Sequence, residues 1–154
     1  RARKTGHILN ITSIAGLNGF PGIGIYNGSK FALEGIGEAL AQEVEPLGIH
    51  VTNVEPGPFR TDWAGTSATY APNTLVDYTE TAEKNAKAIE KVSGNQIGDP
   101  LKAVQAMYSL TQLEHPPLHL PLGAPAYKRS KSKLEAFSAE IDEYEYLGLP
   151  TDYS

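Results

Sequence analysis

The chain has 154 residues, enough for one domain with a hydrophobic core, and 40% of them are apolar and 20% charged. Its 13 basic and 18 acidic residues give a net charge of −5, so we expect no general attraction to nucleic acid or to an anionic membrane. The absence of cysteine excludes disulfide scaffolds and cysteine-based metal sites and fits a cytoplasmic location, and no apolar run is long enough to span a bilayer.

The first third of the chain contains a strand, a helix and a second strand. The apolar, branched residues 6–13 predict a buried strand, and a glycine-rich loop follows at residues 16–24. Apolar residues recur at three- and four-residue spacing over residues 26–46, which predicts an amphipathic helix, and Gly48 stands where a C-cap glycine belongs. Residues 49–54 predict the second strand. This order is typical of a βαβ unit, in which the two strands are parallel.

The rest of the chain predicts three helices and one short strand. Asp77 and Glu80 have the spacing of a capping box, and Asp99 followed by Pro100 is a typical helix start. A proline weakens the prediction of the short strand. After an irregular connection over residues 58–78, the predicted elements are a polar helix from Asp77 to about Val92, a helix from Asp99 to about Leu113, a strand over residues 119–122 and a helix over residues 124–146.

The number of strands indicates an incomplete sheet. A doubly wound sheet has about six strands, whereas only three are predicted here. No glycine-rich phosphate-binding turn follows any of them. We therefore expect an α/β fold that is the C-terminal part of a Rossmann-type doubly wound parallel sheet with flanking helices, with residues 1–154 in one domain.

Three residues near the first strand could carry chemistry. Tyr26 and Lys30 are four residues apart on the predicted helix, so their side chains lie on one face, one turn apart. A nearby cation favours the ionised phenol, and such a tyrosine can exchange protons at neutral pH. Ser13 ends the first strand, where open α/β sheets bind ligands, and its hydroxyl can polarise a substrate oxygen. Taken singly, each residue is more simply interpreted as a surface or turn residue.

A distinctive turn follows the second strand. Pro56 and Gly57 would shape its backbone, and Thr61 offers a hydroxyl and an amide to a ligand. Together with the serine and the tyrosine–lysine pair, this turn resembles the Pro-Gly-x-x-x-Thr turn of the short-chain dehydrogenase/reductase family. The resemblance extends from about Gly6 to Gly123. Its further landmarks are Asp99-Pro100 and Leu120-Pro121-Leu122-Gly123.

The resemblance implies an oxidoreductase that uses NAD or NADP to interconvert an alcohol and a carbonyl compound. Tyr26 would be the general acid/base, Ser13 would hold the reacting oxygen, and Lys30 would support the tyrosine and bind the cofactor ribose. The turn after the second strand would lie beside the nicotinamide ring. The implied catalytic residues are Ser13, Tyr26 and Lys30; the implied cofactor-binding residues are Tyr26, Lys30, Pro56, Gly57 and Thr61; the implied substrate-binding residues are Ser13, Phe59 and Trp63.

The resemblance also implies how the domain is divided. Residues 58–98 would form the substrate-binding loop and lid helix, in which Phe59, Trp63 and Tyr78 either line an apolar pocket or pack the lid against the core. The family's nucleotide-binding half would lie upstream, so this chain would be the C-terminal catalytic half of a single NAD(P)-binding domain and would be inactive alone. The residues that distinguish NAD from NADP would also lie upstream.

Two alternatives for the function stay open. The same catalytic residues could serve an epimerase or dehydratase, or the chain could be a non-catalytic or truncated homologue that binds partners. The family resemblance also implies a homodimer or homotetramer in which the helix at residues 26–46 lines a symmetric contact. Its small residues are Gly28, Ala32, Gly35, Gly37, Ala39 and Ala41.

Histidines and basic residues carry no further prediction of a site. His7, His50, His115 and His119 do not share ligand spacing with a carboxylate on a recognisable element, so we expect no metal site. The basic run over residues 128–133 is more typical of a solvated helix face than of a nucleic-acid-binding patch.

Overall fold

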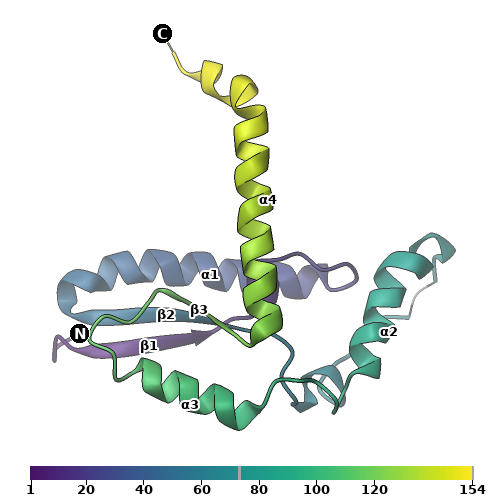
Figure 1. The fold of residues 1–154 in the computed structure, drawn as a ribbon, viewed down its shortest axis with the longest axis horizontal. Coiled ribbons are helices and arrows are strands. Elements are labelled where there is room, and N and C mark those ends of the chain that lie inside the picture. Colours follow the sequence, from purple (N-terminus) through teal and green to yellow (C-terminus); the bar gives the residue numbers. More distant parts are fainter. Residues whose placement is uncertain (73, 154) are drawn as a thin grey trace.

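A computed structural model describes residues 1–72 and 74–153, and a three-stranded parallel sheet lies at its centre (Figure 1). The strands are β1 (Gly6–Ile11), β2 (Ile49–Pro56) and β3 (His119–Leu122), in the order β1-β2-β3. Gly6 lies opposite Ile49, and Ile11 lies opposite Val54. The three predicted strands and the parallel βαβ unit are confirmed, although β1 ends before Ser13. The prediction that β1 is buried is wrong for the described residues, because β1 lies at the edge of the sheet and Ile8 and Ile11 are exposed.

The helix α1 (Gly24–Val44) joins β1 to β2 and begins two residues before the predicted start. A 3₁₀ turn at Glu45–Leu47 follows, because Pro46 has no N–H to continue the α-helical pattern. Gly48 has a φ of 67°, in the left-handed region that glycine adopts without strain. A Cβ there would also lie only 2.5 Å from the carbonyl oxygen of Lys4. The predicted glycine at this helix end is confirmed.

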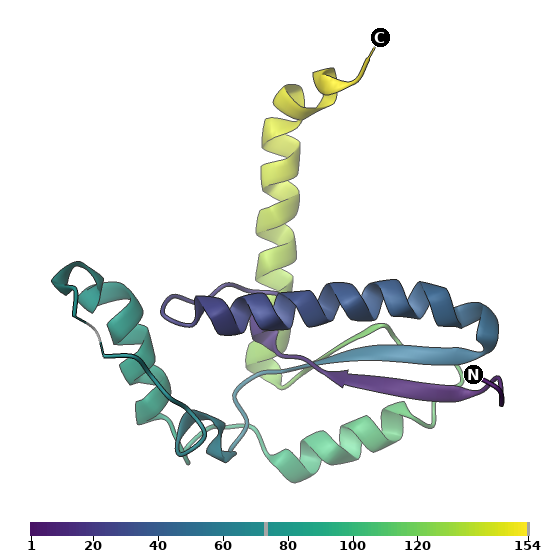
Figure 2. The ribbon, with the colours of Figure 1, turned by 180° about the vertical axis from the view of Figure 1, so that it is seen from behind.

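The helices α1 and α3 (Pro100–Leu110) cover opposite faces of the sheet (Figures 1 and 2). The face toward α3 is apolar, and its buried core consists of Val54, Leu110 and Leu122. The face toward α1 carries polar side chains: Asn10 Nδ2 donates to Asn53 Oδ1 at 3.0 Å. The half-buried side chains packed against the apolar core are Leu9, Phe59, Ala103, Ala106, Met107 and Leu120. Val51 is buried on the same face as Asn53, so the interior toward α1 is mixed, whereas the one toward α3 is apolar.

The two helices before β3 begin differently. Asp99 caps α3 by accepting the N–H of Leu101 at 2.9 Å, as predicted, although α3 ends three residues before Leu113. The polar helix α2 (Lys84–Lys91) is also present. The chain enters it through a 3₁₀ turn at Val76–Tyr78 and a π-helical turn at Thr79–Glu83, and no side-chain cap hydrogen bond starts the π-helical turn. Because Asp77 lies inside the 3₁₀ turn, the predicted capping box is wrong.

The last helix, α4 (Ala124–Gly148), begins directly after β3 and points away from the sheet (Figures 1 and 2). The body of the protein covers its first turns, where Ala126 and Ser130 are buried, and every later residue of α4 is exposed. The predicted final helix is confirmed and extends two residues beyond Tyr146. Among the helices of the described ranges, none has both the length and the apolar character needed to cross a membrane.

Candidate active site

The carboxyl end of β1 forms the first wall of the site. The N–H and the hydroxyl of Thr12 both donate to the carbonyl oxygen of Val54, at 2.8 and 2.9 Å, which holds the chain against β2 as it turns. Ser13 has extended backbone and caps a 3₁₀ turn at Ile14–Gly16, where its Oγ accepts the N–H of Ala15 at 3.1 Å. The buried Ser13 hydroxyl keeps its own proton and can therefore donate to a ligand.

The first two turns of α1 supply a phenol and an ammonium group. Asn27 fixes the loop before the helix, because its Nδ2 donates to the carbonyl oxygen of Phe20 at 2.9 Å. Lys30 reaches back to β1, where its Nζ donates to the carbonyl oxygen of Ile11 at 3.0 Å. The same Nζ lies 5.8 Å from the centre of the Tyr26 ring. The last carbonyl of β1 thus holds the ammonium group beside the phenol.

The turn after β2 forms the third wall, and its backbone packs closely against neighbouring segments. The Gly57 N–H donates to the carbonyl oxygen of Leu122 at 2.9 Å, and a Cβ on Gly57 would lie 3.3 Å from the backbone nitrogen of Ala126. Phe59 then forms a parallel bridge with Gly98. This bridge ties the two ends of the following loop together, so the loop folds back over the ends of the strands.

Thr61 and Trp63 lie on the outer side of the site. The Thr61 hydroxyl caps a 3₁₀ turn at Asp62–Ala64 through a long contact of 3.4 Å to the N–H of Trp63. The turn brings the indole against the phenol: the ring centres of Trp63 and Tyr26 are 5.2 Å apart, with their planes at 50°. Trp63, which the family resemblance implies for substrate binding, therefore packs against Tyr26, which it implies for catalysis.

These segments surround a cavity of about 610 Å³, which is within the usual size range of small-molecule sites. The whole set of residues implied by the sequence lines this cavity: Ser13, Tyr26, Lys30, Pro56, Gly57, Phe59, Thr61 and Trp63. Much of the remaining lining is apolar and includes Ile89, Val104 and Met107. The polar lining consists of a few hydroxyls, the Lys30 ammonium group, the Arg129 guanidinium group and the amides of Asn85 and Gln96, in an otherwise largely apolar chamber. This arrangement can orient a polar group on an otherwise hydrophobic molecule.

The helix α2 closes one side of this cavity. Its Asn85 Nδ2 donates to the carbonyl oxygen of Pro21 in the loop before α1, at 2.8 Å. Gly22 in the same loop has a φ of 78°, and a Cβ there would lie 2.6 Å from the carbonyl oxygen of Ala82. Asn85 and Ile89 both line the cavity. The segment 58–98, predicted as loop and lid, is thus in contact with the loop that precedes Tyr26.

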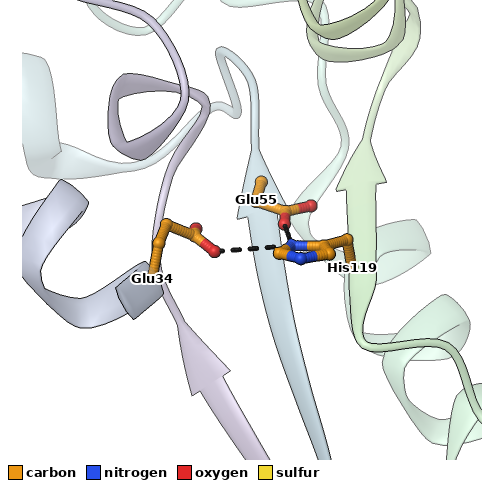
Figure 3. Close-up of side chains that lie close together, drawn as sticks. All are labelled: Glu34, Glu55 and His119. Carbon is orange, nitrogen blue, oxygen red and sulfur yellow. Dashed lines mark hydrogen bonds and ion pairs between the residues drawn. The ribbon is translucent and has the colours of Figure 1, made fainter. Parts of the chain in front are cut away.

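A second polar group lies on the α1 face of the sheet (Figure 3), and none of its members lines the cavity. Glu34 comes from α1, Glu55 from β2 and His119 from β3. His119 Nδ1 is 2.8 Å from Glu55 Oε1 and 3.6 Å from Glu34 Oε2. Both carboxylates are buried, whereas His119 is partly exposed. The expectation that no histidine meets a carboxylate is therefore wrong for His119.

Burial controls the electrostatics of this cluster. It raises the pKa of Glu55 to about 7, against the opposing effect of the hydrogen bond with His119 and with a further increase from the Glu34 charge. Glu34 Oε2 accepts a hydrogen bond from Asn53 Nδ2 at 2.7 Å. The three candidate ligand atoms lie within 4.8 Å of one another, which a metal ion could bridge. Glu55 Oε1 bonds His119 Nδ1 and Glu34 Oε2 accepts from Asn53 Nδ2, whereas Glu34 Oε1 and Glu55 Oε2 are buried and have no hydrogen-bond partner among the described residues. We interpret the cluster as a polar core between α1 and the sheet.

Sequence reasoning missed this cluster because its members lie on three elements that are far apart along the chain. One signal was available. Glu55 is the single charged side chain in the run Val51 to Pro56, which otherwise has the composition of a buried strand. A carboxylate at such a position requires a partner, since an unpaired buried charge is costly. The search for that partner would have led to the histidine on the neighbouring strand.

Comparison with known proteins gives a consistent result. A sequence model described as short chain dehydrogenase matches residues 1–71. The chain is 35% identical over 149 residues to Oxidoreductase BOA17 of Botryotinia fuckeliana, covering 97% of this chain and 54% of that protein. It is 36% identical over 138 residues to 3-ketodihydrosphingosine reductase of Bacteroides thetaiotaomicron, covering 87% of this chain and 51% of that protein. The chain thus spans about half the length of the curated relatives it matches.

Solved structures share the fold. A short-chain dehydrogenase from Streptomyces avermitilis matches with a TM-score of 0.86 and 36% identity, over 98% of this chain and 54% of that one. Two more distant structures support the fold alone. One from Burkholderia cenocepacia in complex with NADP has 20% identity and a TM-score of 0.61, over 90% of this chain and 47% of that one. One from Burkholderia phymatum in complex with NAD has 18% identity and a TM-score of 0.65, over 99% of this chain and 53% of that one.

Proposed function

We propose that this chain, which belongs to the short-chain dehydrogenase/reductase family, is the C-terminal catalytic part of an NAD(P)-dependent oxidoreductase that interconverts an alcohol and a carbonyl compound. One observation carries the proposal. Ser13, Tyr26 and Lys30 come from a strand end and a helix start, and they line the same cavity. The remainder of the single NAD(P)-binding domain, including the nucleotide-binding half, would lie outside this chain.

The proposed chemistry is a proton transfer at the Tyr26 hydroxyl. In the reducing direction, the phenol donates its proton to the oxygen formed from the carbonyl group; in the oxidising direction, the phenolate accepts the alcohol proton. The buried Ser13 hydroxyl donates to the same substrate oxygen and keeps it oriented. The Lys30 ammonium group, anchored on the carbonyl oxygen of Ile11, lies 5.8 Å from the centre of the Tyr26 ring and so stays beside the phenol.

The donor set fits the nicotinamide end of NAD or NADP. The cofactor, when bound, supplies or accepts the hydride. Lys30 has two further N–H donors for ribose hydroxyls, and Thr61 offers a hydroxyl and an amide for a carboxamide. Gly57 presents no side chain to the cavity, which leaves its backbone open to a flat ring. The described strands are not followed by a glycine-rich phosphate-binding turn, so other residues of the full-length protein would hold the phosphates.

The cavity also suggests the type of substrate. Its lining is largely apolar beyond the polar groups named above, and Phe59 and Trp63 add aromatic surface. We therefore propose a substrate with one reacting oxygen on a hydrophobic body. The Bacteroides thetaiotaomicron relative is named as a reductase, which supports reduction as the main direction.

We further propose that the full-length protein is a homodimer or homotetramer with α1 at a symmetric contact. Four of the small residues of α1, namely Gly28, Ala32, Gly35 and Ala39, are exposed and would allow a second helix to approach closely. Gly37 does not belong to that surface. It is buried against the sheet, and a Cβ there would collide with the Asn53 amide.

The proposal is tested by cofactor oxidation in the full-length protein with a panel of hydrophobic ketones and aldehydes, with NADH and NADPH in parallel. Lys30→Met should lower turnover and weaken cofactor binding, because the ammonium group serves both. Ser13→Ala should lower turnover and leave cofactor affinity unchanged, because the serine contacts the substrate oxygen alone. Lys102→Met, which removes an exposed lysine of α3, is the matched control. Equal turnover in the wild type and both site variants would contradict these roles.

A further inference from the structure

An uncovered apolar stripe runs along α4 beyond the body of the protein. Leu134, Phe137, Ile141 and Tyr144 follow one another at intervals of three and four residues, so they share one face of the helix. Each of these side chains is between 50% and 68% exposed. Both views of the fold show this part of the helix standing away from the sheet (Figures 1 and 2). The spacing is that of a two-helix seam without its second helix.

The charges on either side of this stripe are arranged with opposite signs at its two ends. Lys131 and Lys133 flank the N-terminal end, and Glu140 and Glu145 flank the C-terminal end. The geometry of an α-helix places Lys131 and Glu145 along one border of the stripe, and Lys133 and Glu140 along the other. All four residues are exposed. In the described part of the chain, none of the four takes part in an ion pair.

These charges fit a second α4 that runs in the opposite direction. A two-fold axis perpendicular to the helices would place Lys131 of one copy opposite Glu145 of the other, and Lys133 opposite Glu140. Along the sequence, the point halfway between Lys131 and Glu145 lies just after Phe137, and the point halfway between Lys133 and Glu140 lies just before it. One two-fold axis near Phe137 can therefore relate the two copies so that both pairs form. A parallel pair would instead place like charges side by side.

We propose that α4 binds the α4 of a second copy of this chain in an antiparallel pair, with the two-fold axis near Phe137. The apolar stripe supplies the buried seam, and the borders supply four ion pairs, two by each border. The inference rests on α4 alone and holds whether or not the cavity has the proposed activity. It describes a contact separate from the one proposed for α1.

A second copy explains the surface better than an anionic membrane does. A membrane surface would attract the basic end of the stripe and repel the acidic end, whereas an antiparallel copy satisfies both ends. The acidic flank also continues the charge trend of the whole helix, which carries its lysines before Leu134 and its glutamates from Glu135 onward. Self-complementarity of this kind is what an isologous interface requires.

Charge reversal tests the proposal in the full-length protein. Lys131→Glu with Lys133→Glu makes both borders acidic, and Glu140→Lys with Glu145→Lys makes both borders basic. Each double variant should lose one association step in sedimentation velocity, with the dissociation constant raised at least about tenfold, because four attractive pairs become repulsive. An equimolar mixture of the two variants should restore the step, since an acidic helix then meets a basic one.

The controls lie on the opposite face of α4. Lys128→Glu and Glu143→Lys change the same charges away from the stripe and should leave sedimentation unchanged. Wild-type association in both border variants would overturn the proposal. If, in addition, Phe137→Ser lowered the melting temperature, we would conclude that another segment of the same polypeptide covers the stripe. Binding of the wild type to anionic vesicles, with no change of association in the variants, would assign it to a membrane.

Cysteine trapping tests the orientation in a full-length protein from which any other cysteine has been removed; residues 1–154 contain none. Ser138 lies next to the proposed axis, so Ser138→Cys should form a disulfide with its own copy. Lys131→Cys should not do so alone but should cross-link to a second variant, Glu145→Cys. A parallel pair would bring identical positions within the stripe together along its whole length, whereas the antiparallel pair places Leu134 opposite the other end of the stripe. Efficient self-cross-linking of Leu134→Cys would therefore overturn the antiparallel arrangement.

Discussion

The stability of the protein should depend on pH through Glu55, and replacing Glu55 with glutamine should remove most of that dependence. Glu55 is fully buried on β2 and bonds His119 at 2.8 Å, and burial raises its pKa from 4.5 to about 7. An acid whose pKa is higher in the folded state binds its proton more tightly there than in the unfolded chain. The contribution of Glu55 to the free energy of unfolding is therefore fully present at acidic pH and is lost as the pH rises from about 4.5 to 7.

The magnitude follows from the two pKa values. Each unit of pKa difference corresponds to about 1.4 kcal/mol, and the part of the shift titrated between pH 5 and pH 8 amounts to about 2 to 3 kcal/mol. Glu55→Gln keeps the size of the side chain and can still bond His119, but it has no charge to desolvate. The free energy of unfolding of the wild type should thus fall by about 2 to 3 kcal/mol more than that of the variant over this range.

The assay is urea unfolding of the full-length protein at pH 5 and pH 8. Glu43→Gln, which neutralises an exposed carboxylate on α1, is the matched control and should follow the wild type. The comparison of variant with wild type removes the contribution of groups that titrate in both. Identical pH dependence in the wild type and Glu55→Gln would refute the assignment of a desolvated carboxylate to this position.

Two further predictions concern the fragment and its assembly. Residues 1–154 made alone should be poorly soluble and should not bind a nicotinamide dinucleotide, because β1 pairs only with β2 in the described sheet and leaves Ile8 and Ile11 exposed; micromolar binding in calorimetry would contradict this. On α1, Ala32→Arg should remove one association step of the full-length protein in sedimentation velocity, because a long charged side chain prevents close helix approach. A wild type that sediments as a monomer at micromolar concentration would contradict both the α1 contact and its disruption.

Local signals predicted most of the secondary structure. Gly48 and Asp99 act through their own backbone and near neighbours, so their positions could be recognised without knowledge of the fold. The predicted capping box at Asp77 is wrong for a reason that is also local to that segment of the chain. The chain makes a 3₁₀ turn there and enters the helix through a wider π-helical turn, so the aspartate lies before the cap position. The spacing between Asp77 and Glu80 alone does not distinguish a regular α-helical start from this sequence of 3₁₀ and π-helical turns.

Contacts between residues that are far apart along the chain were harder to predict from the sequence. The resemblance to a known family led to the residues around the cavity, but it did not reveal that Lys30 is anchored on the carbonyl oxygen of Ile11. The Glu34–Glu55–His119 cluster depends on which face of β2 meets α1 and on the pairing of β2 with β3. The course of α4 away from the sheet depends on how its first turns pack. None of these features follows from periodicity in a single segment.

The central claim, that Tyr26 is the acid/base of this cavity, is tested most directly by Tyr26→Phe in the full-length protein. The variant removes one hydroxyl and keeps the ring that packs against Trp63 at 5.2 Å, so folding and cofactor affinity should be retained. Turnover should fall by about 10²- to 10⁴-fold, the usual contribution of general acid–base catalysis. Cofactor titration and steady-state kinetics on the same preparation separate binding from chemistry. Turnover close to that of the wild type, with intact cofactor binding, would contradict the account.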